Sequence, residues 1–179
     1  MVVLIGVVAT ALVRLPTFVW LAADTFTAER MGDFSVFHHA AVVASRGGHP
    51  YGADSLKASN GGVIPNLNPP QFVLITRPLA ALTPRSALAV WMAASLLSAV
   101  AALVLIARAT SATPLAIGAM LLLVTCSAAT GAFVVAMQVT WLLWGPLAWS
   151  WVAMRRGRWT SAAVIVGVLV SLKPFLLPL

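Results

Sequence analysis

The amino-acid sequence predicts an all-α integral membrane protein, a bundle of several spans with one large polar segment near its start. Hydrophobic residues make up 61% of the 179 residues and charged residues only 8%, against about 45–50% and 25% in soluble domains. The mean hydropathy of +0.98 agrees. The net charge of +7 does not indicate a nucleic-acid partner, because most basic residues are scattered singly and Lys and Arg beside apolar runs mainly set membrane topology.

Apolar runs of membrane-crossing length recur along the chain, and about 20 helical residues are needed to cross a bilayer. The predicted spans cover residues 2–23, 86–107, 114–136, 139–154 and 161–179. The first run is a span rather than a cleaved signal peptide, because no basic segment precedes it and Arg14 interrupts it. Snorkelling toward the headgroups is the favoured explanation of Arg14, and a lipid-phosphate or carboxylate partner is the alternative.

The segment 24–85 is the only polar part of the chain, and it is predicted to be a loop at the membrane surface. It contains all four acidic residues, namely Asp24, Glu29, Asp33 and Asp54. It also contains all three histidines and the single tyrosine, namely His38, His39, His49 and Tyr51. Any carboxylate chemistry of this protein must therefore take place here.

Two short helices are predicted within this loop, over residues 33–46 and 71–83. Gly47-Gly48 follows the first helix and is a good C-terminal signal. The second is bounded by prolines and broken by Arg77-Pro78, and it is too short to be a full span. Both helices are expected to lie at the interface rather than to cross it.

The basic residues predict the orientation. The connections 108–113 and 155–160 fall on one side of the membrane and carry four arginines with no acid. The positive-inside rule makes that side cytoplasmic. The N-terminus is then cytoplasmic, the loop 24–85 is extracytoplasmic, and the protein is a multi-pass protein of the cell membrane.

Residue types alone leave the roles within the loop open. Asp33 precedes a predicted helix and suits either an N-cap or a general base that deprotonates a hydroxyl. His38 and His39 point about 100° apart on a helix, and no third ligand is placed beside them, so no metal site is predicted. Tyr51 lies between Pro50 and Gly52 and is predicted to be a turn residue.

Several motifs in order resemble glycosyltransferase family 87, whose members are polyprenyl-phosphate-sugar-dependent mannosyl- and arabinosyl-transferases of the membrane GT-C class. Within the loop the resemblance rests on Gly32-Asp33-Phe34, Gly47-Gly48-His49-Pro50-Tyr51, Asn68-Pro69-Pro70 and the run Pro78-Leu79-Ala80-Ala81-Leu82. Later in the chain it rests on Met137-Gln138-Val139-Thr140, Arg155-Arg156-Gly157-Arg158 and Leu172-Lys173-Pro174. No single motif is diagnostic, but their order together is fairly specific.

The resemblance implies a GT-C-like bundle that transfers a mannose-like or arabinose-like sugar from a polyprenyl-phosphate donor to a lipid or glycan acceptor, with inversion. It implies Asp33 as the general base. Lys173, and Arg14 as a further cation, are expected at the donor phosphate. His38, His39, Tyr51 and Gln138 are assigned to the acceptor or loop site. No cofactor is implied.

The chain departs from the family pattern in two motifs and in length. Asn68 replaces the usual aromatic residue before Pro-Pro, and Met137 replaces the usual glycine before Gln138. Family members are roughly twice as long or more, so the sequence is expected to be an incomplete chain that continues beyond Leu179.

A non-catalytic subunit for transport or assembly, whose outer loop docks a partner, is the alternative function. Transporters usually place charged groups inside their spans. The predicted spans after Pro70 contain only Lys173 as a charged residue of this kind. That distribution favours chemistry at the surface.

Overall fold

The structure is a computed structural model, and it describes residues 16, 32–52, 66–126, 130 and 139–173. The described part is all-helical, as predicted. Its elements in chain order are α2 (Gly32–Ser45), α3 (Pro70–Thr76), the 3₁₀ helix η3 (Arg77–Ala81), α4 (Pro84–Thr110), α5 (Pro114–Cys126), α7 (Thr140–Arg155) and α8 (Trp159–Leu172). The predicted span 2–23 and most of residues 127–138 lie outside the described residues.

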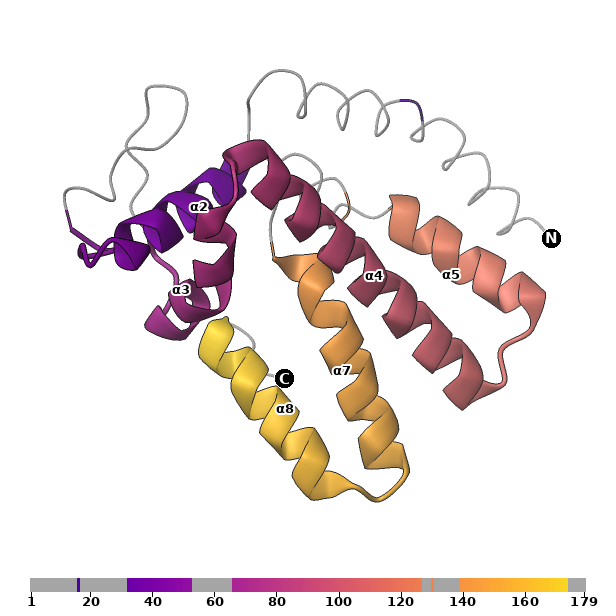
Figure 1. Cartoon of the computed structure of the whole chain (residues 1–179). Helices are drawn as coiled ribbons and strands as arrows, with labels where there is room; N and C mark the ends of the chain where they lie inside the picture. Colours follow the sequence, from indigo (N-terminus) through magenta and orange to yellow (C-terminus); the bar gives the residue numbers. More distant parts are fainter. Residues whose placement is uncertain (1–15, 17–31, 53–65, 127–129, 131–138, 174–179) are drawn as a thin grey trace.

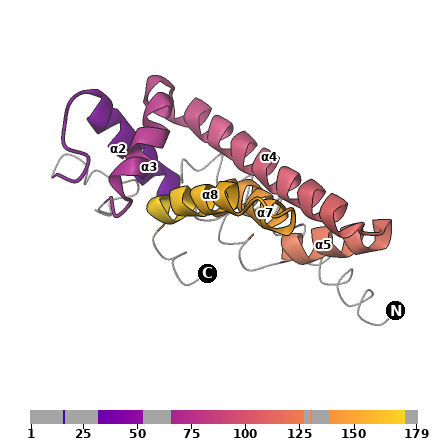
Figure 2. The same ribbon diagram turned by 90° about the horizontal axis from the view of Figure 1, so that it is seen from below.

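The described helices form two groups (Figures 1 and 2). The long helix α4 packs against α7 and α5, and α7 packs against α8. The short elements α2, α3 and η3 gather where α4 begins and α8 ends (Figure 1). The polar segment of the sequence is therefore placed at one end of the bundle.

Helix α4 is the one described helix that is long and apolar enough to cross a membrane. Its 27 residues extend about 40 Å at 1.5 Å per residue. Only 22% of its most apolar window is buried within the described chain, and large side chains such as Leu97 are exposed. An apolar exposed surface of this kind suits lipid rather than water.

Helices α4 and α7 are joined at the point where Pro146 removes a backbone hydrogen bond from α7. Pro146 has no N–H, so the carbonyl of Leu142 loses its helical donor. The Ser98 hydroxyl on α4 donates to that carbonyl at 2.7 Å and accepts the Gly145 N–H at 2.9 Å. A Cβ at Gly145 would lie 2.7 Å from the Ser98 Oγ. Only glycine allows this approach between the two helices.

A tight turn reverses the chain between α7 and α8. Gly157 has a φ of +71°, and the Arg158 N–H bonds to the Ala153 carbonyl at 2.9 Å. Arg155 stacks over the Trp151 ring at 5.1 Å and donates to the Ala109 carbonyl at 3.2 Å. The arginine thus ties the end of α7 to the last turn of α4, where a cation is electrostatically favoured.

Helix α2 ends in a Schellman motif, as the paired glycines predict. Gly47 has a φ of +77°, its N–H bonds to Ala44 at 3.2 Å, and the Gly48 N–H bonds to Val43 at 2.9 Å. Gly48 also approaches Val43 closely, since a Cβ there would lie 2.8 Å from the Val43 side chain. The paired glycines therefore end α2 because a side chain would be unfavourable at both positions, through the positive φ of Gly47 and the close approach of Gly48 to Val43.

The bounds of three predicted elements differ from the structure for local reasons. The segment 71–83 is two elements, because Pro78 interrupts α3 and the chain tightens into η3. The predicted span 161–179 is longer than the observed helix, since α8 covers Trp159–Leu172. Helix α8 ends at Leu172, and Lys173 is extended (φ −139°, ψ 90°), as expected of a residue before proline. Helix α4 begins at Pro84, capped by the Thr83 hydroxyl, which accepts the Ser86 N–H at 3.3 Å.

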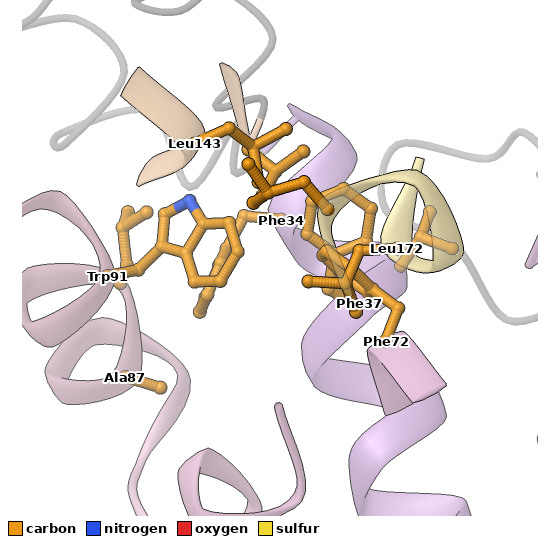
Figure 3. Packing of buried hydrophobic residues seen from close by; sticks show 11 residues of the cluster. Phe34, Phe37, Phe72, Ala87, Trp91, Leu143 and Leu172 are labelled. Carbon is orange, nitrogen blue, oxygen red and sulfur yellow. The ribbon is translucent and has the colours of Figure 1, made fainter. Parts of the chain in front are cut away.

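One buried cluster holds the two groups of helices together (Figure 3). The Phe37 ring contacts Phe72 at 4.8 Å and Trp91 at 5.7 Å between centroids. Phe34 contacts Trp91 at 5.8 Å, and Leu143 and Leu172 join the same cluster. These side chains come from α2, α3, α4, α7 and α8, so the cluster fixes the short helices on the bundle.

Candidate functional site

Asp33 lies in the first turn of α2 and is half-buried. A carboxylate at this position favours the helix, because it faces the positive end of the helix dipole. Phe34, the next residue, is fully buried in the core. The core therefore fixes the backbone from which the Asp33 carboxylate projects.

Lys173 directly follows α8 and is half-buried. Its N–H bonds to the Leu169 carbonyl at 2.9 Å, and Leu172 before it lies in the core. Burial lowers the pKa of the Lys173 ammonium, and the negative charge of Asp33 opposes that shift. The charge of Asp33 thus acts on Lys173 although 140 peptide bonds separate the two residues in the sequence.

The hydrophobic cluster explains how this pair comes together. Phe34 and Leu172 are the immediate neighbours of Asp33 and Lys173, and both belong to the cluster (Figure 3). Burying two such side chains fixes the start of α2 beside the end of α8. One carboxylate and one ammonium group are thereby placed at the same end of the bundle.

His38 is buried and has a structural contact. Its Nε2 lies 3.2 Å from the Leu82 carbonyl, its ring stacks on Phe34 at 5.9 Å, and only 8% of its surface is exposed. This histidine joins α2 to the connection between η3 and α4. The contact gives His38 a role in holding the two elements together.

His39 is half-buried and, with His38, lines a cavity between α2 and the Ala80–Arg85 stretch. Asp33 is not among the residues that line this cavity. At about 100° per residue on a helix, His38 and His39 point about 140° and about 120° away from Asp33. The structure thus places the predicted base and the two predicted acceptor-site histidines on different sides of α2.

Tyr51 connects the turn after α2 to the start of α3. Its hydroxyl donates to the Asn68 carbonyl at 2.8 Å, and its N–H bonds to the His49 Nδ1 at 3.3 Å. Partial burial raises the pKa of the Tyr51 phenol, so the hydroxyl stays protonated as a donor at neutral pH. The sequence prediction of a turn residue accounts for this position without an acceptor contact.

Two asparagines, which the sequence analysis did not assign to the site, support the same turn. The Asn66 side chain donates to the Pro50 carbonyl at 3.4 Å and accepts both the backbone and the side-chain N–H of Asn68, at 3.1 and 3.0 Å. Asn66 is buried. In the sequence only Asn68 before Pro69 indicated this turn, since asparagine often stabilises turns through its own side chain.

The remaining predicted site residues, Arg14 and Gln138, lie outside the described residues. Among the residues that the structure describes, no group of three His, Cys, Asp or Glu side chains comes together as a metal site would require.

Comparison with known proteins identifies the family of this chain. Residues 66–179 match the model of Glycosyltransferase family 87. The matched part includes Lys173 and begins after Asp33 and Tyr51. No curated protein and no solved structure matches the chain. Because the family model covers more than half of the sequence, the chain belongs to glycosyltransferase family 87, a family of membrane transferases of the GT-C class.

Proposed function

We propose that this protein transfers a sugar from a polyprenyl-phosphate donor to the hydroxyl of a lipid or glycan acceptor at the outer face of the cell membrane. Asp33 is the general base and Lys173 contacts the donor phosphate. The observation that carries the proposal is that Phe34 and Leu172, the chain neighbours of these two residues, are buried in one cluster, which brings the carboxylate and the ammonium to the same end of the bundle. Membership in a glycosyltransferase family supports the reaction class.

The pair supplies the two charges that such a reaction needs. The acceptor oxygen attacks the anomeric carbon of the sugar, and the bond from that carbon to the phosphate oxygen breaks. Asp33 takes the proton of the attacking hydroxyl. Lys173 stabilises the negative charge that develops on the departing lipid phosphate. A single displacement of this kind inverts the anomeric configuration.

The position of the pair suits a donor whose lipid tail lies in the bilayer. Asp33 is in the first turn of α2 and Lys173 follows the end of α8. Helix α2 and the end of α8 lie toward the end of the bundle where the membrane-length helix α4 begins (Figures 1 and 2). The donor phosphate would then lie near the headgroups while its polyprenyl chain extends along the helices. We propose the same end as the extracytoplasmic one, which follows from the arginines of the α4–α5 and α7–α8 connections.

The other sequence candidates take supporting roles in this proposal. Arg14 is proposed as a second cation for the donor phosphate, and Gln138 as a polar group on the same outer side. Tyr51 keeps the turn beside α3 in place through Asn68. His38 positions α2 through Leu82 rather than acting on the acceptor.

The test compares Asp33→Asn with Asp54→Asn in the full-length protein. Transfer of labelled mannose or arabinose from polyprenyl-phosphate donors is measured in membranes that contain equal amounts of each variant. We expect Asp33→Asn to lower turnover by about 10²-fold or more, since general bases contribute about 10²–10⁴-fold. The Asp54→Asn variant should stay near the wild-type rate. Near-normal turnover of Asp33→Asn would refute the role of this carboxylate as base.

A further inference from the structure

A concave site lies on the side of α2 that does not carry Asp33. It is a cavity of about 740 Å³ between α2 and the Ala80–Arg85 stretch that leads into α4. Its polar lining residues are Ser35, His38, His39, Arg46, Thr83 and Arg85. The volume is in the range of small-molecule sites, about 300–1,000 Å³.

Two of the described residues that line this cavity are arginines. Arg46 comes from the end of α2 and Arg85 from the first turn of α4, so the two walls each contribute a guanidinium group. No acidic residue is among the described residues that line it. Guanidinium groups bind phosphate oxygens through paired hydrogen bonds.

The cavity also has an apolar part. Val42, Leu82 and Pro84 are among its lining residues, and Leu82 is 38% exposed. A bare inorganic anion gains nothing from such a surface. A molecule that carries a phosphate beside glycerol and acyl carbons would contact both the arginines and the apolar side chains.

The position of the cavity beside the start of α4 indicates which class of molecule it binds. Arg85 is the second residue of α4, which is the described helix of membrane length. The cavity is therefore at the end of an apolar helix, where the hydrocarbon core meets the headgroup layer. Phosphates of membrane lipids are concentrated in that layer.

We propose that this cavity binds the phosphate headgroup of an anionic membrane lipid. Arg46 and Arg85 contact the phosphate from opposite walls, and Val42 and Leu82 contact the glycerol and first acyl carbons. The site is separate from the Asp33–Lys173 pair and does not depend on the proposed sugar transfer. A bound lipid would connect α2 to α4 at the membrane surface.

The test measures lipid preference of the full-length protein in detergent by native mass spectrometry. Palmitoyl-oleoyl phosphatidylglycerol is the anionic probe, and phosphatidylcholine with the same acyl chains is the zwitterionic control. The test variant is the double change Arg46→Gln with Arg85→Gln. The matched control is Arg77→Gln, which removes an exposed arginine in η3 that does not line the cavity.

We expect wild type and Arg77→Gln to prefer phosphatidylglycerol by about tenfold, as two charge-assisted contacts allow. The double variant should bind the two lipids equally. Size-exclusion profiles establish that each variant is folded. If the double variant fails that check, the two single variants are compared instead, and each should lose about threefold in preference.

Three results would overturn the proposal. Equal binding of both lipids by the wild type would mean that the cavity does not select anionic lipid. An equal loss in Arg77→Gln and the double variant would mean that general surface charge accounts for the preference. Displacement of phosphatidylglycerol by an equal concentration of inorganic phosphate would identify a free anion as the ligand. The Asp33→Asn variant should keep the lipid preference, which distinguishes a failure here from a failure of the transferase proposal.

Discussion

The two sides of helix α2 have opposite chemical characters. One side carries Asp33, whose carboxylate interacts with Lys173 at the end of α8. The other side lines a cavity with Arg46 and faces Arg85 of α4. The carboxylate side is held by the aromatic cluster, whereas the cavity side combines basic and apolar residues. A single short helix therefore separates the proposed chemistry from the proposed lipid contact.

The difference teaches that proximity in sequence is a poor guide to a shared site on a helix. Asp33 and His38 are five residues apart, yet they point to different sides of α2. Asp33 and Lys173 are at opposite ends of the described chain, yet they interact. The predictions below test this separation, beginning with the largest expected effect.

Phe37→Ala tests the packing of the carboxylate side. Phe37 is buried against Phe72 and Trp91, and removal of a buried Phe side chain costs about 3–5 kcal/mol. The free energy of unfolding in mixed micelles should fall by that amount. The control is Val42→Ala on the cavity side, a half-buried residue, which should cost less than about 1.5 kcal/mol. Equal losses would show that the two sides contribute equally to stability.

Lys173→Ala tests whether the ammonium binds the donor. We expect the KM for the polyprenyl-phosphate sugar to rise about tenfold, equivalent to about 1.4 kcal/mol, because a charge-assisted contact to phosphate is lost. Arg46→Gln on the other side should leave that KM within about twofold. A larger effect of Arg46→Gln on donor KM would place the donor phosphate in the cavity and so reverse the assignment of the two sides.

Ser98→Ala tests the contact that positions α7, and with it the core beneath Asp33. The change leaves the Leu142 carbonyl and the Gly145 N–H without the Ser98 hydroxyl. We expect a loss of about 1–2 kcal/mol in unfolding free energy. The matched control is Ser86→Ala, an exposed serine at the start of the same helix. If Ser98→Ala left the stability unchanged, the Leu142 carbonyl beside Pro146 would not need the hydroxyl of α4 as a hydrogen-bond donor.

Gly47→Ala tests the end of α2 next to the cavity. The φ of +77° makes a side chain unfavourable there by about 1 kcal/mol. Gly118→Ala is the control, because Gly118 lies within α5 and a Cβ there meets nothing within 4 Å. The control should be neutral or stabilising by up to about 1 kcal/mol. Thermal unfolding of both variants measures the difference, and a stable Gly47→Ala would show that the Schellman turn does not limit stability.

Local signals in the sequence mark several helix ends, although the predicted bounds differ by a few residues. Gly47-Gly48 ends α2 as predicted, Pro78 interrupts the segment after Pro70, and Pro84 begins α4 two residues before the predicted start. Each of these residues acts on the backbone beside it, either through a missing N–H or through a positive φ. Such effects are readable without knowledge of the fold.

The candidate site was predictable only in its components. Asp33 and Lys173 were named from the sequence, but no pattern places the two together, since that contact depends on the burial of Phe34 and Leu172 in one cluster. The cavity was missed, although Ser35, His39, Val42 and Arg46 recur at helical spacing and would have indicated that they share one side of α2. Arg85 lies 39 residues after Arg46 and gave no local signal.

By itself the sequence determined that this is a helical membrane protein, that α2 ends at its paired glycines, and that its acids are confined to one polar segment. These properties follow from composition and from short-range backbone chemistry. The tertiary structure alone decided which charged residues share one region. Asp33 lies at the same end of the bundle as Lys173, and Arg46 lines the same cavity as Arg85, because the aromatic core fixes α2 in one rotation against α4 and α8. The rotation of a packed helix is set by long-range contacts that no local pattern encodes.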